Sequence, residues 1–162
     1  MDVLAANPLA TALAPYYTPG ENLVRATFLD RRLRDRYEDW DRAAAAIVAA
    51  LRALVGPDAD DPQLNELVGE LSVRSERFRQ LWARHDARPK RSGTTRIQHP
   101  QLGALELNYE KLPIPEADRQ TLCVYHAAPA SSSAQALTLL ATATATATQP
   151  YERETTRSAP TT

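Results

Sequence analysis

The hydrophobic pattern of this chain changes period once, and that change limits the folds it can adopt. Over residues 38–55 the apolar side chains recur every three or four positions, as on one face of a helix. Beyond residue 94 they alternate with polar side chains, as in half-buried strands. Helices and strands are therefore segregated along the sequence, which predicts an α+β domain whose antiparallel sheet packs against a layer of helices.

The longest expected helix covers residues 38–55 and ends before Gly56-Pro57. Its stripe consists of Trp40, Ala44, Ile47, Val48, Leu51 and Leu54. Two more helices are expected after it, one capped by Asp61 and one over residues 75–85 that is capped by Ser75.

The N-terminal part of the chain is expected to hold shorter elements. The apolar run over residues 2–6 predicts a short strand before Asn7-Pro8. Residues 18–21 have the spacing of a capping box with proline at the first helical position, which predicts the start of a helix there.

Three strands are expected in the C-terminal half, over residues 94–98, 105–110 and 121–127. A last helix is expected over residues 131–141. The alternating Ala-Thr sequence beyond it has no apolar stripe and is of low complexity. We therefore expect one domain over residues 1–141 and a disordered tail over residues 142–162.

Composition narrows the class of protein. A chain of 162 residues with 43% apolar residues can bury one core, and a net charge of −1 gives no general attraction to nucleic acid or membranes. The single cysteine, Cys123, forms no internal disulfide, which suits a reducing compartment. The first ten residues lack a signal-peptide pattern, and no apolar run is long enough to span a bilayer. A cytoplasmic protein is expected.

Motifs for catalysis and cofactor binding are absent from the sequence. The three histidines and one cysteine have no metal-ligand spacing, so no metal is expected. No nucleophile elbow, dinucleotide fingerprint or phosphate loop is present. We expect a protein that is not an enzyme and that holds no cofactor.

The segment over residues 74–96 is basic, with eight Lys or Arg against two acidic residues. Its aromatic residues fall on the apolar stripe and are not interleaved with the arginines as a base-stacking surface would require. A solvated face is the simplest interpretation, and docking of a second domain or a second protomer is the alternative.

Seven short sequence motifs follow one another along the chain in the order in which a known family carries them: NPLATAL, FLD, DW, LVGELS, SERFRQLWARHD, HPQLGALELNYE and VYHAAPASSSAQALTLLA. They resemble the MmyB-like transcription regulator ligand-binding domain, the C-terminal sensory half of XRE-type helix-turn-helix regulators. The resemblance implies a PAS-like fold that binds a fatty-acid-like ligand between sheet and helices. It also implies that DNA is reached only through a helix-turn-helix domain, and none precedes this domain in the given sequence.

The apolar stripes supply candidates for the lining of such a ligand site: Phe28, Trp40, Phe78, Trp82, Leu107 and Tyr109. His85 is the candidate polar anchor for a ligand carboxylate. The alternative for the aromatic residues is plain core packing, and for His85 it is a helix-terminal cap. The alternative function is a dimerisation or protein-interaction module that takes no small molecule, and a homodimer is compatible with either function.

Overall fold

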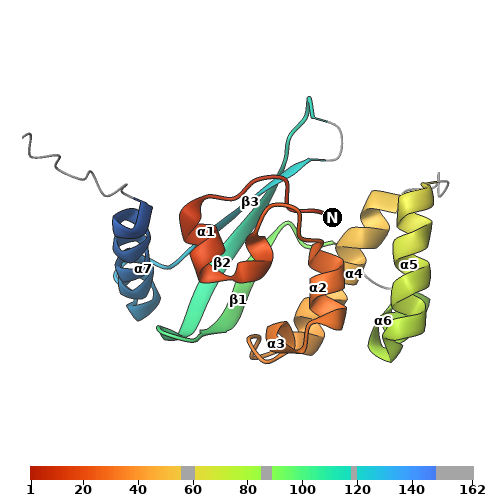
Figure 1. The fold of residues 1–162 in the computed structure, drawn as a ribbon, viewed down its shortest axis with the longest axis horizontal. Coiled ribbons are helices and arrows are strands. Elements are labelled where there is room, and N and C mark those ends of the chain that lie inside the picture. Colours follow the sequence, from red (N-terminus) through yellow and green to blue (C-terminus); the bar gives the residue numbers. More distant parts are fainter. Residues whose placement is uncertain (56–60, 85–88, 118–119, 149–162) are drawn as a thin grey trace, which may run out of the picture.

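The computed structural model describes residues 1–55, 61–84, 89–117 and 120–148. Within these ranges the chain forms seven α-helices, one short 3₁₀ helix and one three-stranded antiparallel sheet. Helices α2, α4, α5 and α6 gather on one side of the sheet, and α7 lies at its other end (Figure 1). The predicted α+β class is confirmed, and the PAS-like topology that the resemblance implies stays a prediction.

The helices before the sheet are α1 Pro8–Leu13, η1 Pro15–Tyr17, α2 Leu23–Leu29, α3 Arg31–Arg34, α4 Trp40–Val55, α5 Pro62–Arg74 and α6 Glu76–Ala83. Five of them, α1, α2, α3, α5 and α6, begin at a residue whose side chain accepts from backbone N–H groups of the first turn. The side chain of Asp61 accepts from the first backbone N–H groups of α5, and that of Ser75 accepts from Phe78 N–H at the start of α6. Both predicted caps are therefore confirmed.

Two predictions near the N-terminus are wrong. Residues 2–6 form no strand, because this segment pairs with the chain around Asn22 through one isolated bridge only. The predicted capping box begins no helix either, because residues 18–21 form a turn in which Gly20 has a φ of +94°. Helix α2 begins later, where the Asn22 side chain accepts from the N–H groups of Val24 and Arg25.

The sheet has the order β1-β2-β3, with β1 Ser92–His99, β2 Gly103–Pro113 and β3 Thr121–His126, which confirms the three predicted strands. Directly opposed residues of antiparallel strands share a face. The register pairs Thr95 with Leu107 and Tyr109 with Tyr125. One face, called the inner face below, therefore carries Thr95, Ile97, Leu105, Leu107, Tyr109, Lys111, Cys123 and Tyr125.

The core is divided into separate clusters. The helical core consists of Val24, Ala44, Val48, Leu51, Leu67, Leu71, Phe78 and Leu81. The sheet core consists of Leu13, Ile97, Leu105, Leu107 and Leu140. Helices α1 and α7 thus cover the hairpin end of the inner face. The rest of that face is turned toward α4.

Helix α7, Ser132–Thr148, continues seven residues beyond the end predicted at residue 141. Residues 142–148 are therefore helical, and the expectation of disorder is wrong for them; residues 149–162 lie outside the described part of the chain. Alanine is the best helix former. The Thr142 and Thr146 hydroxyls donate to carbonyls one turn earlier, so the Ala-Thr repeat satisfies its polar groups within the helix.

Candidate functional site

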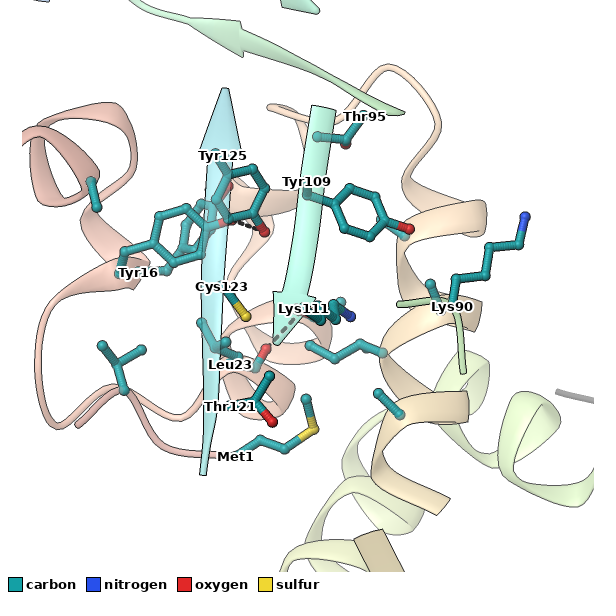
Figure 2. Close-up of a pocket in the computed structure, with 18 of the residues that line it drawn as sticks. Met1, Tyr16, Leu23, Lys90, Thr95, Tyr109, Lys111, Thr121, Cys123 and Tyr125 are labelled. Carbon is teal, nitrogen blue, oxygen red and sulfur yellow. Dashed lines mark hydrogen bonds between the residues drawn. The ribbon is translucent and has the colours of Figure 1, made fainter. Parts of the chain in front are cut away.

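A cavity of about 1590 Å³ lies between the inner face of the sheet and α4 (Figure 2). The chain around residues 1–7 and the η1 turn form its other walls, and it is partly open to solvent. Binding sites for small molecules usually span roughly 300–1,000 Å³ and lie between secondary-structure layers. The cavity is therefore large enough for an extended apolar molecule.

The α4 wall of the cavity is made of small side chains. Apart from Arg42 in the first turn, α4 lines the cavity with Ala43, Ala46, Ile47, Ala50 and Ala53, which recur at helical spacing along one face. The opposite face of α4 places Ala44, Val48 and Leu51 in the helical core. Because an alanine side chain ends at its Cβ atom, the cavity face of α4 leaves a gap in front of the sheet where larger residues would fill it.

Tyrosines form the facing walls. Five of the six tyrosines of the sequence line the cavity: Tyr16, Tyr17, Tyr37, Tyr109 and Tyr125. Tyr16 Oη donates to Tyr37 Oη over 3.2 Å, and Tyr17 Oη donates to Tyr125 Oη over 2.8 Å. The Tyr17 and Tyr125 ring centroids lie 5.4 Å apart, and those of Tyr109 and Tyr125 lie 6.3 Å apart. The cluster joins residues 108 positions apart in the chain.

Burial raises the pKa of Tyr16 and Tyr17 well above the ordinary tyrosine value, and the neighbouring phenols add to the effect. The pKa values of Tyr37 and Tyr125 are also raised, again mainly by burial. These four phenols therefore stay protonated at neutral pH. They present a wall that is largely aromatic in surface and that holds hydroxyl pairs at fixed positions.

The charged groups at the cavity are unevenly paired. Arg96 binds Glu106 at 2.7 Å and Glu38 at 3.5 Å at the edge of the sheet, which accounts for both carboxylates. Lys111 projects from the inner face of β2, and its Nζ lies 5.6 Å from the centre of the Tyr109 ring. Cys123 lies opposite Lys111 in the register, and burial raises the pKa of its thiol while Lys111 opposes that rise.

Four of the predicted lining residues lie in or against the helical core, on the far side of α4 from the cavity. The Phe28 ring lies edge-on to the rings of Trp40 and Phe78, and the Phe78 ring stacks on Trp82 at 5.6 Å between centroids. Trp40 Nε1 donates to the Thr27 carbonyl over 3.1 Å. Phe28 and Trp40 also border a smaller hollow of about 580 Å³, whose other lining residues are mostly charged or polar.

The remaining predicted residues have three different positions. Leu107 is fully buried in the sheet core. Tyr109 lines the cavity. His85 lies outside the described residues.

Sequence reasoning missed the residues that form most of the cavity: the alanines of α4, four of the tyrosines and Lys111. The AAAAIVAA run over residues 43–50 is one available signal, because a helix with this run has two faces of unequal side-chain size. The alternation of Cys123 and Tyr125 is a second signal, since it places both side chains on one face of a strand.

The described part of the chain contains neither a candidate metal-binding group nor a candidate membrane-spanning helix. The described residues hold no group of three or more His, Cys, Asp or Glu side chains that could bind a metal ion. No helix within the same ranges is long and apolar enough to cross a membrane.

A large apolar and aromatic cavity between sheet and helices is the kind of place where small-molecule binding domains hold their ligands. A sequence model of the MmyB-like transcription regulator ligand binding domain matches residues 1–140, and the chain belongs to this family. The family consists of ligand-binding domains of transcription regulators and is not a class of enzyme. No curated protein sequence matches the chain.

Proposed function

We propose that the domain senses a small apolar or fatty-acid-like molecule, which it binds in the cavity between α4 and the sheet. The observation that carries this proposal is the cavity of about 1590 Å³ with an alanine wall on one side and a tyrosine wall on the other. Four of the five lining tyrosines are hydrogen-bonded in pairs, so the tyrosine wall presents aromatic surface and few free hydroxyls.

Burial of an acyl chain supplies the affinity. Each methylene that leaves water for an apolar surface contributes about 0.8 kcal/mol. The side chains of Ala46, Ile47 and Ala50 on one wall and Leu23 on another offer such a surface along the cavity. A chain of several methylenes therefore gains enough free energy to offset the entropy lost on binding.

Signalling requires the ligand to bind one domain arrangement better than another, since equal affinity for both shifts no equilibrium. The N-terminal segment is the candidate moving part, because Met1, Val3 and Ala6 line the cavity directly. In this proposal ligand contact sets the position of that segment. DNA is then controlled through the helix-turn-helix domain that the family resemblance implies, and the domain acts in the cytoplasm.

One observation favours a second function, a dimerisation or interaction module. Strand β3 is an edge strand, and the face of the sheet opposite the inner face exposes Leu112 and Val124 with 49% and 39% of their surfaces accessible. Exposed apolar edges are surfaces on which chains associate. Sedimentation of wild type and of Val124→Lys tests this function, which predicts a concentration-dependent dimer that the substitution abolishes.

Native mass spectrometry of the purified domain, followed by extraction, tests the ligand proposal. We expect a bound apolar species in the native spectrum, and a rise in Tm when the delipidated domain meets a medium-chain or long-chain fatty acid. Ala50→Phe is the matched variant, because it fills the α4 wall and should weaken the shift. If no species co-purifies and no acid of the series changes Tm, the proposal fails.

A further inference from the structure

The Lys111 ammonium and the Tyr109 phenol lie side by side at the cavity, and no acceptor for either is found within the described ranges. We propose that these two side chains hold the carboxylate of the fatty-acid-like ligand. The inference rests on the proposed function and deepens it, because it assigns the residues that bind the head group and the orientation of the ligand in the cavity.

Lys111 has the position that such a role requires. It lies on the inner face of β2, between Tyr109 on the same strand and Cys123 opposite, and its side chain is only partly exposed. No ion pair to Lys111 occurs among the residues that the structure describes, and its Nζ lies 5.6 Å from the centre of the Tyr109 ring. An ammonium placed beside an aromatic wall without a carboxylate attracts an anion that brings its own apolar chain.

Tyr109 differs from the other tyrosines of the cavity. Tyr16 is hydrogen-bonded to Tyr37, and Tyr17 to Tyr125, so those four hydroxyls are engaged with one another. The Tyr109 side chain lies over Gly93 of the neighbouring strand. A Cβ atom added to Gly93 would lie 2.8 Å from the Tyr109 hydroxyl oxygen. No hydrogen bond of this hydroxyl is found within the described residues, and Figure 2 shows it pointing toward α4.

The carboxylates at the cavity are engaged elsewhere. Glu38 and Glu106 pair with Arg96. Asp39 accepts from the Arg42 backbone N–H over 3.0 Å, and Asp2 accepts from Asn22 Nδ2 over 2.7 Å. Among the described residues, no carboxylate of the cavity lining pairs with Lys111, so a ligand can supply the counter-charge.

The segment before β1 adds two more basic residues to the cavity lining. The backbone N–H of Lys111 donates to the Arg91 carbonyl over 2.7 Å, and both Lys90 and Arg91 line the cavity. A carboxylate has two oxygens, so it can accept from the Lys111 ammonium and from the Tyr109 hydroxyl together. With the head group held there, the apolar chain lies along the alanine wall of α4.

Calorimetric titration of the delipidated domain with decanoic acid and with decan-1-ol tests the assignment, because the two ligands share a chain and differ in charge. Hydrogen bonds to charged groups contribute enough that Lys111→Met should weaken decanoate binding about tenfold or more. The same variant should change decanol binding less than about twofold. Tyr109→Phe should weaken decanoate binding by roughly threefold to tenfold, because it removes one donor and keeps the ring.

Two control variants make the result interpretable. Lys111→Arg keeps the charge and should keep most of the affinity for decanoate. Arg79→Met removes an exposed cation from α6, away from the cavity, and should bind both ligands as wild type does. Far-ultraviolet circular dichroism and unfolding curves establish that each variant is folded.

The outcomes separate the two proposals. If wild type binds neither ligand, the proposed function itself fails. If wild type binds both ligands and Lys111→Met binds decanoate as wild type does, the proposed function is retained and the head-group assignment is overturned. Equal loss of both ligands in Lys111→Met also overturns it, because the substitution then acts through the shape of the cavity.

Discussion

The two faces of α4 show how one helix can serve both a solid core and an open cavity. On one face Ala44, Val48 and Leu51 are buried together with Phe78, and the partly buried rings of its aromatic neighbours pack against this core. On the other face Ala46 and Ala50 line the cavity, whose facing walls carry tyrosines of the sheet and of η1.

The two faces of α4 differ in the side chains that lie opposite them. The helical core gathers large apolar rings, and close packing there leaves no room for a ligand. The cavity pairs short side chains on α4 with a wall of tyrosines, four of which are hydrogen-bonded to one another. In this domain the aromatic stripe of α6 therefore belongs to the helical core, and the alanine stripe of α4 borders the cavity.

The largest expected effect comes from Phe78→Ala in the helical core. Phe78 is fully buried between Phe28 and Trp82, so its truncation should lower the free energy of unfolding by about 3–5 kcal/mol. The matched change on the cavity side, Tyr109→Ala, should lower it by less than about 2 kcal/mol because that ring faces open space. Urea unfolding of both variants makes the comparison, and equal losses would contradict the contrast between the two faces.

Alkaline pH should destabilise the tyrosine side specifically. The pKa values of Tyr16, Tyr17, Tyr37 and Tyr125 are raised in the folded state, so their contribution to stability is complete below the unfolded pKa. Above pH ~10 the unfolded phenols ionise first, and each costs about 1.4 kcal/mol of stability per pH unit until its folded pKa is reached. The absorbance of these four tyrosinates during a pH titration should rise together with unfolding. Ionisation of more than two of the six tyrosines before loss of structure would show that the cluster is not buried.

A matched pair of substitutions on α4 separates stability from binding. Ala44→Phe overpacks the helical core and should cost about 1–3 kcal/mol or more of stability. Ala50→Phe projects into the cavity and should change stability little, while each methylene it displaces from the ligand lowers affinity about fourfold. Unfolding curves and decanoate titrations measure both quantities. Unimpaired binding in Ala50→Phe would place the ligand elsewhere.

The smallest expected effect is that of Gly93→Ala. The new Cβ would lie 2.8 Å from the Tyr109 hydroxyl, and the end of that side chain can move to relieve the contact. We expect nearly unchanged stability and a loss of decanoate affinity of a few fold, similar to that of Tyr109→Phe, because the hydroxyl leaves its position. Affinity equal to wild type would indicate that the hydroxyl position does not matter for binding.

Local signals in the sequence predicted the elements well where each element carries its own signal. Asp61 and Ser75 cap the helices that they were expected to cap, and the period-2 alternation located the three strands. The start of α2 was misplaced because residues 18–21 match the spacing of a capping box and form a turn instead. Helix α7 was ended too early because threonine hydroxyls that bond within the helix cannot be read from hydrophobic periodicity.

The candidate site depends on contacts between residues that lie far apart in the chain, and local sequence patterns do not predict such contacts. Tyr17 and Tyr125 meet only because η1 lies against the sheet, and Tyr109 faces Tyr125 only through the strand register. Hydrophobic periodicity on a helix also shows which face is buried, but it does not show which other element packs against that face. Phe78 and Trp82 form a clear stripe, and the structure places them on the far side of α4 from the cavity.

Protection of Cys123 by a ligand tests the central claim most directly. Cys123 is the only cysteine of the chain and lines the cavity opposite Lys111, so a thiol reagent reports on one position. Its raised pKa calls for mildly alkaline conditions, below the pH at which the tyrosines ionise. If the ligand occupies the cavity, the labelling rate of the folded domain falls in proportion to decanoate saturation. An unchanged rate at full saturation would show that the ligand binds outside this cavity.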